Sequence, residues 1–165
     1  MATAFAPRDT VAGFAGRTLK NLRYITKASD LRQVHLVTHL TISMLGLLVF
    51  PHEYLKRLPA DSPIRQAYES EIRSLTSRKW PHWNKWAHHV GRPGNIQTRL
   101  CHLRNALSHR RIHFSSDSRE LSDVTINFWD QSNDRGPIKW HVSIRGDYLH
   151  KFVFQFGKLV ARALG

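Results

Sequence analysis

The 165-residue sequence predicts a mainly α-helical fold with a short β-hairpin before the last helix. Apolar residues recur at helical spacing along most of the chain, whereas two short segments near its end alternate apolar and polar residues as half-buried strands do. The length is that of one ordinary domain, which is long enough to bury a hydrophobic core. We therefore expect residues 1–165 to form a single domain.

Two long helices are expected in the first third of the chain. The first is predicted from about Asp9, a good N-terminal cap, to near Ala28. The second begins near Ser29 and ends at Pro51, which has no backbone N–H to continue it. This second helix is apolar around most of its circumference, but its uninterrupted apolar run is too short for a membrane span. It therefore predicts a central helix of a soluble domain and no membrane partner.

The middle of the chain predicts a third helix from Asp61 to Leu75, which places its apolar residues on one face. Beyond it, Trp80, Trp83 and Trp86 recur every three residues among basic side chains. Such rings either stack on unpaired bases or pack together as a helical turn. The sequence leaves both interpretations open.

A break at Gly91–Gly94 precedes a further helix, which is expected from about Asn95 to between Ser108 and Arg111. Turn-rich residues then separate two strand-like segments, and an amphipathic helix follows. These last predicted elements are Val124–Trp129, Trp140–Ile144 and Asp147–Leu164.

The charge of the chain points to a polyanionic partner. Its 25 Lys and Arg outnumber 12 Asp and Glu, which gives a formal net charge of +13. No acidic residue occurs between Ile72 and Ser116, a segment rich in Arg, Lys and His. Nucleic acid is the commonest partner of so basic a domain.

The single cysteine, Cys101, excludes an intramolecular disulfide and fits a reducing compartment. We expect it to fill a small gap at a helix contact. Residues Met1–Thr10 lack the basic start and apolar core of a secretory signal, so a cytoplasmic location is expected.

The predicted helix after the break carries the chemistry-bearing motif Arg104-Asn105-Ala106-Leu107-Ser108-His109. At about 100° per residue, Arg104, Asn105, Ser108 and His109 fall on one arc, and the apolar residues of the helix fall on the other side. The helix therefore predicts one buried face and one polar face directed to solvent.

These residue types suit cleavage of RNA, which carries its own nucleophile in the 2′-hydroxyl. An imidazole such as that of His109 can transfer protons near neutral pH. The guanidinium of Arg104 can stabilise charge on the phosphate oxygens, and the amide of Asn105 can orient either partner. This scheme requires no metal or cofactor. The side chains that we expect to contact RNA around the motif are Arg99, Ser108, Arg110 and Arg111.

The spacing of Arg104, Asn105 and His109, followed by a strand pair and a final helix, resembles the HEPN family (higher eukaryote and prokaryote nucleotide-binding domains). The first sixty residues also resemble the paired long helices of bacterial members. The resemblance implies an HEPN-like helical bundle and a metal-independent ribonuclease that dimerises through the motif helix. It also implies a toxin or phage-defence role and an inhibitor or antitoxin protein as partner. Family toxins silenced by modification often carry a tyrosine where this chain has Arg111, which argues against that regulation.

A second function class stays open from the sequence: a catalytically inactive HEPN module that binds nucleic acid or serves as an adaptor. The positive charge suits either class. A helix-turn-helix DNA reader is disfavoured, because no short three-helix unit with a recognition helix is evident.

Overall fold

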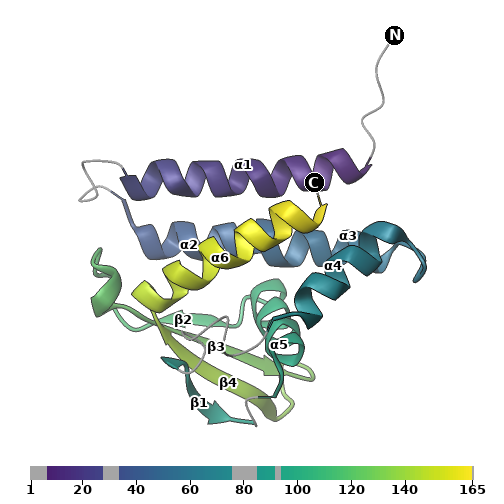
Figure 1. Ribbon diagram of the computed structural model, residues 1–165. Coiled ribbons are helices and arrows are strands. Elements are labelled where there is room, and N and C mark those ends of the chain that lie inside the picture. Colours follow the sequence, from purple (N-terminus) through teal and green to yellow (C-terminus); the bar gives the residue numbers. More distant parts are fainter. Residues whose placement is uncertain (1–6, 28–33, 76–84, 92–93, 165) are drawn as a thin grey trace.

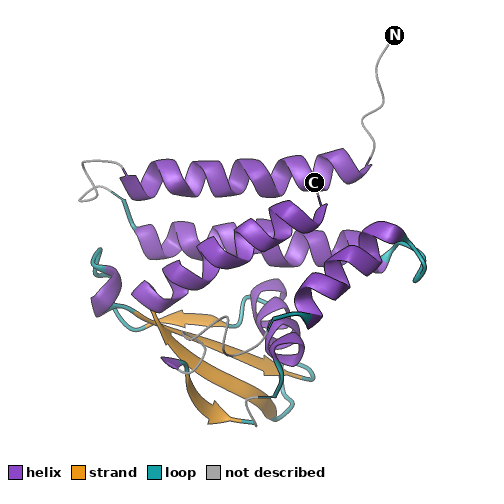
Figure 2. Ribbon diagram, viewed as in Figure 1, coloured by secondary structure: helices purple, strands orange, loops and turns teal. Residues whose placement is uncertain are grey.

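The computed structural model describes residues 7–27, 34–75, 85–91 and 94–164. Helices form one layer of the fold, and a small sheet with a helix beside it forms the other (Figure 1; Figure 2). The helical elements are α1 (Pro7–Lys27), α2 (Leu36–Met44), the π-helical turn η2 (Leu45–Val49), α3 (Phe50–Lys56), α4 (Pro63–Arg73), α5 (Ile96–Ser108), the 3₁₀ turn η4 (Leu121–Asp123) and α6 (Gly146–Leu164). The strands are β1 (Ala87–Val90), β2 (Ile112–Phe114), β3 (Thr125–Gln131) and β4 (Ile138–Arg145).

The helical layer consists of α1, the continuous run from α2 to α3, and α6, which contacts both (Figure 1). The predictions for α1, α4, α5 and α6 are confirmed to within a few residues at each end. The prediction that the second helix begins near Ser29 falls outside the described residues. The predicted mainly α-helical fold is thus confirmed.

The prediction that Pro51 ends the second helix is wrong. The helix passes from α2 through η2 into α3 and continues to Lys56. Proline lacks the N–H for an α-helical hydrogen bond, and its ring clashes with the carbonyl four residues earlier. The π-helical turn changes the hydrogen-bond pattern just before Pro51, which then lies in the first turn of α3, where proline is tolerated.

The run Leu36–Lys56 is long and apolar enough to cross a membrane by length and composition. In the folded chain 44% of its apolar window is buried, and it contacts α1, α5 and α6. These contacts fit the interpretation of a core helix in a soluble domain.

The sheet is antiparallel with the order β1-β4-β3-β2. The predicted hairpin is confirmed as β3 and β4, whose register pairs Phe128 with Val142. The edge strands β1 and β2 were not predicted, because four and three residues are too few to display a clear alternation.

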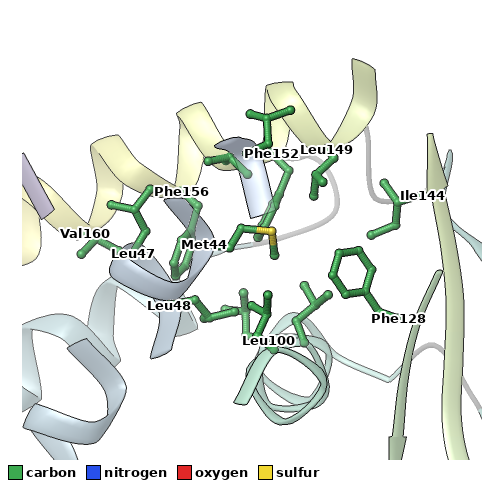
Figure 3. Packing of buried hydrophobic residues seen from close by; sticks show 14 of the residues in the cluster. Met44, Leu47, Leu48, Leu100, Phe128, Ile144, Leu149, Phe152, Phe156 and Val160 are labelled. Carbon is green, nitrogen blue, oxygen red and sulfur yellow. The ribbon is translucent and has the colours of Figure 1, made fainter. Parts of the chain in front are cut away.

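The core lies where α6, the α2–η2 run, α5 and the inner face of the sheet meet (Figure 3). Of the tryptophan cluster, Trp86 is buried and packs edge-on against Phe152 at 5.3 Å between ring centroids. Trp86 thus follows the packing interpretation, whereas Trp80 and Trp83 lie outside the described residues. The core residues labelled in Figure 3 are Met44, Leu47, Leu48, Leu100, Phe128, Ile144, Leu149, Phe152, Phe156 and Val160.

We expect Gly46→Ala to destabilise the protein, because α1 packs directly against this glycine of η2. An added Cβ would lie 2.5 Å from Phe14 Cε1 and 3.0 Å from Thr18 Oγ1. Such overpacking costs about 1–3 kcal/mol of unfolding free energy, measurable by chemical denaturation. Gly16→Ala in α1 is the matched control, since an added Cβ there meets nothing within 4 Å. The control should be neutral or stabilising, and equal losses in both variants would contradict the packing argument.

Candidate active site

Helix α5 is fixed at its start by the cap that the sequence predicted. The Asn95 side chain accepts a hydrogen bond of 2.9 Å from the Thr98 N–H and one from its hydroxyl. The inner face of the helix is buried against η2 and β3. The residues of this buried face are Ile96, Leu100, Leu103, Ala106 and Leu107.

The end of α5 is a left-handed cap. Arg110 has a φ of 56°, which is uncommon for a residue other than glycine. Its N–H bonds to the Leu107 carbonyl at 3.3 Å, and the Arg111 N–H bonds to the Ala106 carbonyl at 2.8 Å. Both bonds satisfy carbonyls that a helix end would otherwise leave unpaired. His109 stands at the last position before this cap and is exposed.

Arg104 points toward the helical layer. Its Nη1 lies 3.5 Å from Glu53 Oε1 on α3, and its side chain is 23% exposed. Its Nε is buried without a hydrogen-bond partner among the described residues. A distance of 3.5 Å is long for a charge-assisted hydrogen bond, so this pair leaves much of the guanidinium free for another anion.

Asn105 points instead toward the sheet. Its Nδ2 donates to Asp130 Oδ2 on β3 at 2.8 Å, and the same oxygen lies 2.8 Å from His102 Nδ1. Because an ionised carboxylate only accepts, this contact is a hydrogen bond in the tautomer that carries the proton on His102 Nδ1. The His102 ring stacks on Trp140 at 5.2 Å between centroids. Asp130 therefore orients two side chains of α5.

Arg111 is buried, and this differs from the RNA contact expected of it. Its Nη1 donates to the Gln131 carbonyl at 2.6 Å and lies 3.7 Å from Asp130 Oδ1, while its Nη2 donates to Asp134 Oδ1 at 3.2 Å. Only 8% of the side chain is exposed. These contacts give Arg111 a structural role at the end of the β3–β4 hairpin.

The other residues predicted to contact RNA differ in their exposure to solvent. Ser108 and Arg110 are exposed beside His109. Arg99 is partly buried, and burial lowers the pKa of its guanidinium. Cys101, expected to fill a helix contact, is instead exposed and lines a cavity next to Arg104.

The three predicted catalytic residues do not converge within one chain. Arg104 and Asn105 turn toward opposite layers, and the described residues show no hydrogen bond or ion pair between Arg104 and His109. The described residues also contain no group of three or more His, Cys, Asp or Glu that could hold a metal ion.

Sequence reasoning did not single out Glu53, His102 or Asp130. Asp130 carries a usable signal, because it continues the inward alternation of Ile126 and Phe128 along β3 and so places a carboxylate at a core position. Glu53 has no comparable signal, since its partner Arg104 is distant in the sequence.

The fold and the motif together define a mainly α-helical domain with an exposed histidine at the end of a half-buried helix and an arginine five residues before it. The family model HEPN pEK499 p136 matches residues 5–163. The chain therefore belongs to this HEPN family. Comparisons with curated proteins and with solved structures gave no match.

We expect Asp130→Ala to destabilise the fold far more than Asp134→Ala. Both carboxylates pair with Arg111, but the Asp130 side chain is 10% exposed and that of Asp134 is 98% exposed. Removing the buried partner takes the carboxylate away from Asn105 and His102, leaves Arg111 with Asp134 and the Gln131 carbonyl, and costs about 3 kcal/mol. Removing the exposed one costs less than about 1 kcal/mol. Urea denaturation of both variants measures the difference, and equal losses would refute the role given to Asp130.

Proposed function

We propose that this HEPN domain is a metal-independent endoribonuclease of the cytoplasm with a toxin or phage-defence role. The observation that carries the proposal is that Arg104 of α5 and His109 at the end of this helix have different surroundings. The left-handed cap holds His109 in solvent, and Arg104 keeps donor capacity beside a cationic cavity. Family membership and the charge of +13 support the same conclusion. An inhibitor or antitoxin is a further proposed partner.

In the proposed reaction the 2′-oxygen of RNA attacks the adjacent phosphorus, and the bond to the 5′-oxygen of the next nucleotide breaks. His109 accepts the proton of the 2′-hydroxyl or delivers one to the leaving oxygen. Arg104 binds the non-bridging oxygens as their charge grows. Asn105, held by Asp130, positions the substrate or Arg104 in this proposal. The products are a 2′,3′-cyclic phosphate and a 5′-hydroxyl.

The described residues show no contact that joins Arg104 to His109, which favours an active site that two copies of the chain complete. If the exposed strips of two α5 helices cross about a two-fold axis, Arg104 of one protomer approaches the partner's His109. Exposed apolar side chains on α1 and on the run from α2 to α3 support self-association. Phe14, Ile42, Leu45 and Phe50 are each more than 40% exposed. Phe50 lies one turn before Glu53, the residue that contacts Arg104.

A second candidate function is nucleic-acid binding or an adaptor role without chemistry. The Arg104–Glu53 pair favours it, because an arginine held by a carboxylate is less available to a phosphate. The two candidates differ in whether RNA is cleaved when it binds.

We expect the purified protein to cleave RNA in the presence of EDTA. His109→Ala and Arg104→Ala should each lower the rate by about a hundredfold or more, because proton transfer and charge stabilisation contribute that much. His113→Ala is the matched control, since His113 is an exposed histidine outside the motif. Gel analysis of a labelled RNA, beside the same strand with a single 2′-deoxy nucleotide at the cleaved position, gives the readout. Full activity of either motif variant, or cleavage at the deoxy position, would refute the mechanism.

Mixing the two inactive variants tests the shared site. Random exchange makes about half of the dimers heterodimers, and each of these holds one intact pairing of Arg104 with His109 out of two. We expect about a quarter of the wild-type activity after refolding the mixture. Separately refolded variants are the control, and a mixture that stays inactive contradicts pairing across the two-fold axis.

A further inference from the structure

A cavity of about 340 Å³ opens beside Arg104 between α3, α4 and α5. Its floor is apolar and includes one aromatic ring. The floor residues are Leu48, Leu55, Tyr68, Ile72 and Leu100, all of them buried. A volume near the lower end of the range for small-molecule sites suits a compact ligand with a flat apolar body.

The rim of this cavity is cationic. Lys56, Arg65, Arg73 and Arg104 line it. Glu69 is shared by Arg65 at 2.8 Å and Arg73 at 3.3 Å, so one carboxylate serves two guanidinium groups. Counting Glu69 and the neighbouring Glu53, two carboxylates face four cations. The rim therefore keeps positive charge for an anionic group.

Two uncharged polar side chains, Gln97 on α5 and His52 on α3, also line the cavity. Gln97 offers an amide that both donates and accepts. His52 lines the cavity from α3, and burial, with Arg104 as the next cause, lowers the pKa of its imidazole. A neutral imidazole likewise both donates and accepts. Such groups suit the polar edge of a heterocycle better than a purely aliphatic ligand.

We propose that the cavity binds one nucleotide unit, with its base on the apolar floor and its phosphate at Arg104. In the free protein Glu53, which lies outside the cavity lining, pairs with Arg104 through the long 3.5 Å contact, and the phosphate displaces this carboxylate from the guanidinium. The inference rests on the proposed function only for the source of the nucleotide. An RNA substrate supplies it as the residue next to the cleaved bond, whereas a free mononucleotide supplies it as a separate ligand.

Calorimetric titration of the full chain with the four ribonucleoside 5′-monophosphates tests the cavity without any cleavage. At least one should bind about tenfold more tightly than ribose 5-phosphate or the matching nucleoside, because the site needs both base and phosphate. Gln97→Trp, which fills the cavity, and Arg73→Glu, which reverses rim charge, should each weaken binding about tenfold. Gln155→Trp on α6 and Arg119→Glu are exposed controls outside the cavity and should have no effect.

Glu53→Gln is a variant that should strengthen nucleotide binding, whereas the two cavity variants should weaken it. Removing the negative charge that competes with phosphate should tighten nucleotide binding about threefold or more, a gain that misfolding cannot produce. Weaker binding in this variant would overturn the displacement by phosphate.

Cleavage of a randomised RNA pool separates the two sources. If RNA supplies the nucleotide, Gln97→Trp reduces the preference of the enzyme for one base beside the cleaved bond. If a free nucleotide is the ligand, this base preference stays unchanged, while Gln97→Trp still weakens nucleotide binding in the calorimetric titration. If the protein binds a nucleotide but does not cleave RNA, the ribonuclease proposal is refuted and the cavity proposal stands. Ribose 5-phosphate binding as tightly as the nucleotides would overturn the proposal. So would the absence of nucleotide binding together with an unchanged preference in Gln97→Trp.

Discussion

The buried carboxylate of Asp130 is the interaction on which the candidate site depends. A charge in the interior is costly unless it is paired and hydrogen-bonded. Asp130 meets this requirement with Asn105, His102 and Arg111, which belong to α5 and to the residues just after it. One side chain of β3 therefore fixes both the rotation of α5 and the path by which the chain leaves it. The exposed position of His109 follows from that constraint, because the cap lies between Asn105 and Arg111.

Neighbouring residues of α5 serve different halves of the fold. Arg104 reaches the helical layer at Glu53, whereas Asn105 reaches the sheet at Asp130. The helix thus connects the two layers through polar contacts while its apolar face fills the core between them (Figure 3). A small shift of either layer would change the distance between the guanidinium and the imidazole. The geometry of the motif is in this sense a property of the whole fold.

Local signals predicted much of this structure. Asn95 marked the start of α5 correctly because capping is a local hydrogen bond, and the β3–β4 hairpin was evident from alternation alone. The role of Arg111 was not predictable, because its burial depends on carboxylates that only the folded hairpin brings close. The divergence of Arg104 and Asn105 escaped prediction for a similar reason. An angular projection places residues on a helix but does not identify the neighbours on each side.

The π-helical turn η2 has a consequence for the evolution of the cavity. Such a turn accommodates one extra residue in an otherwise α-helical run, which rotates everything after it by about 100° relative to an uninterrupted helix. His52, Glu53 and Leu55 all follow this turn. A relative that lacks one residue within Leu45–Val49 and forms a plain α-helix there would keep these three side chains on the same face, whereas a relative that closes the π turn without losing a residue would aim them elsewhere. The hydrogen-bond pattern of this one turn thus decides which side chains of α3 reach α5 and line the cavity.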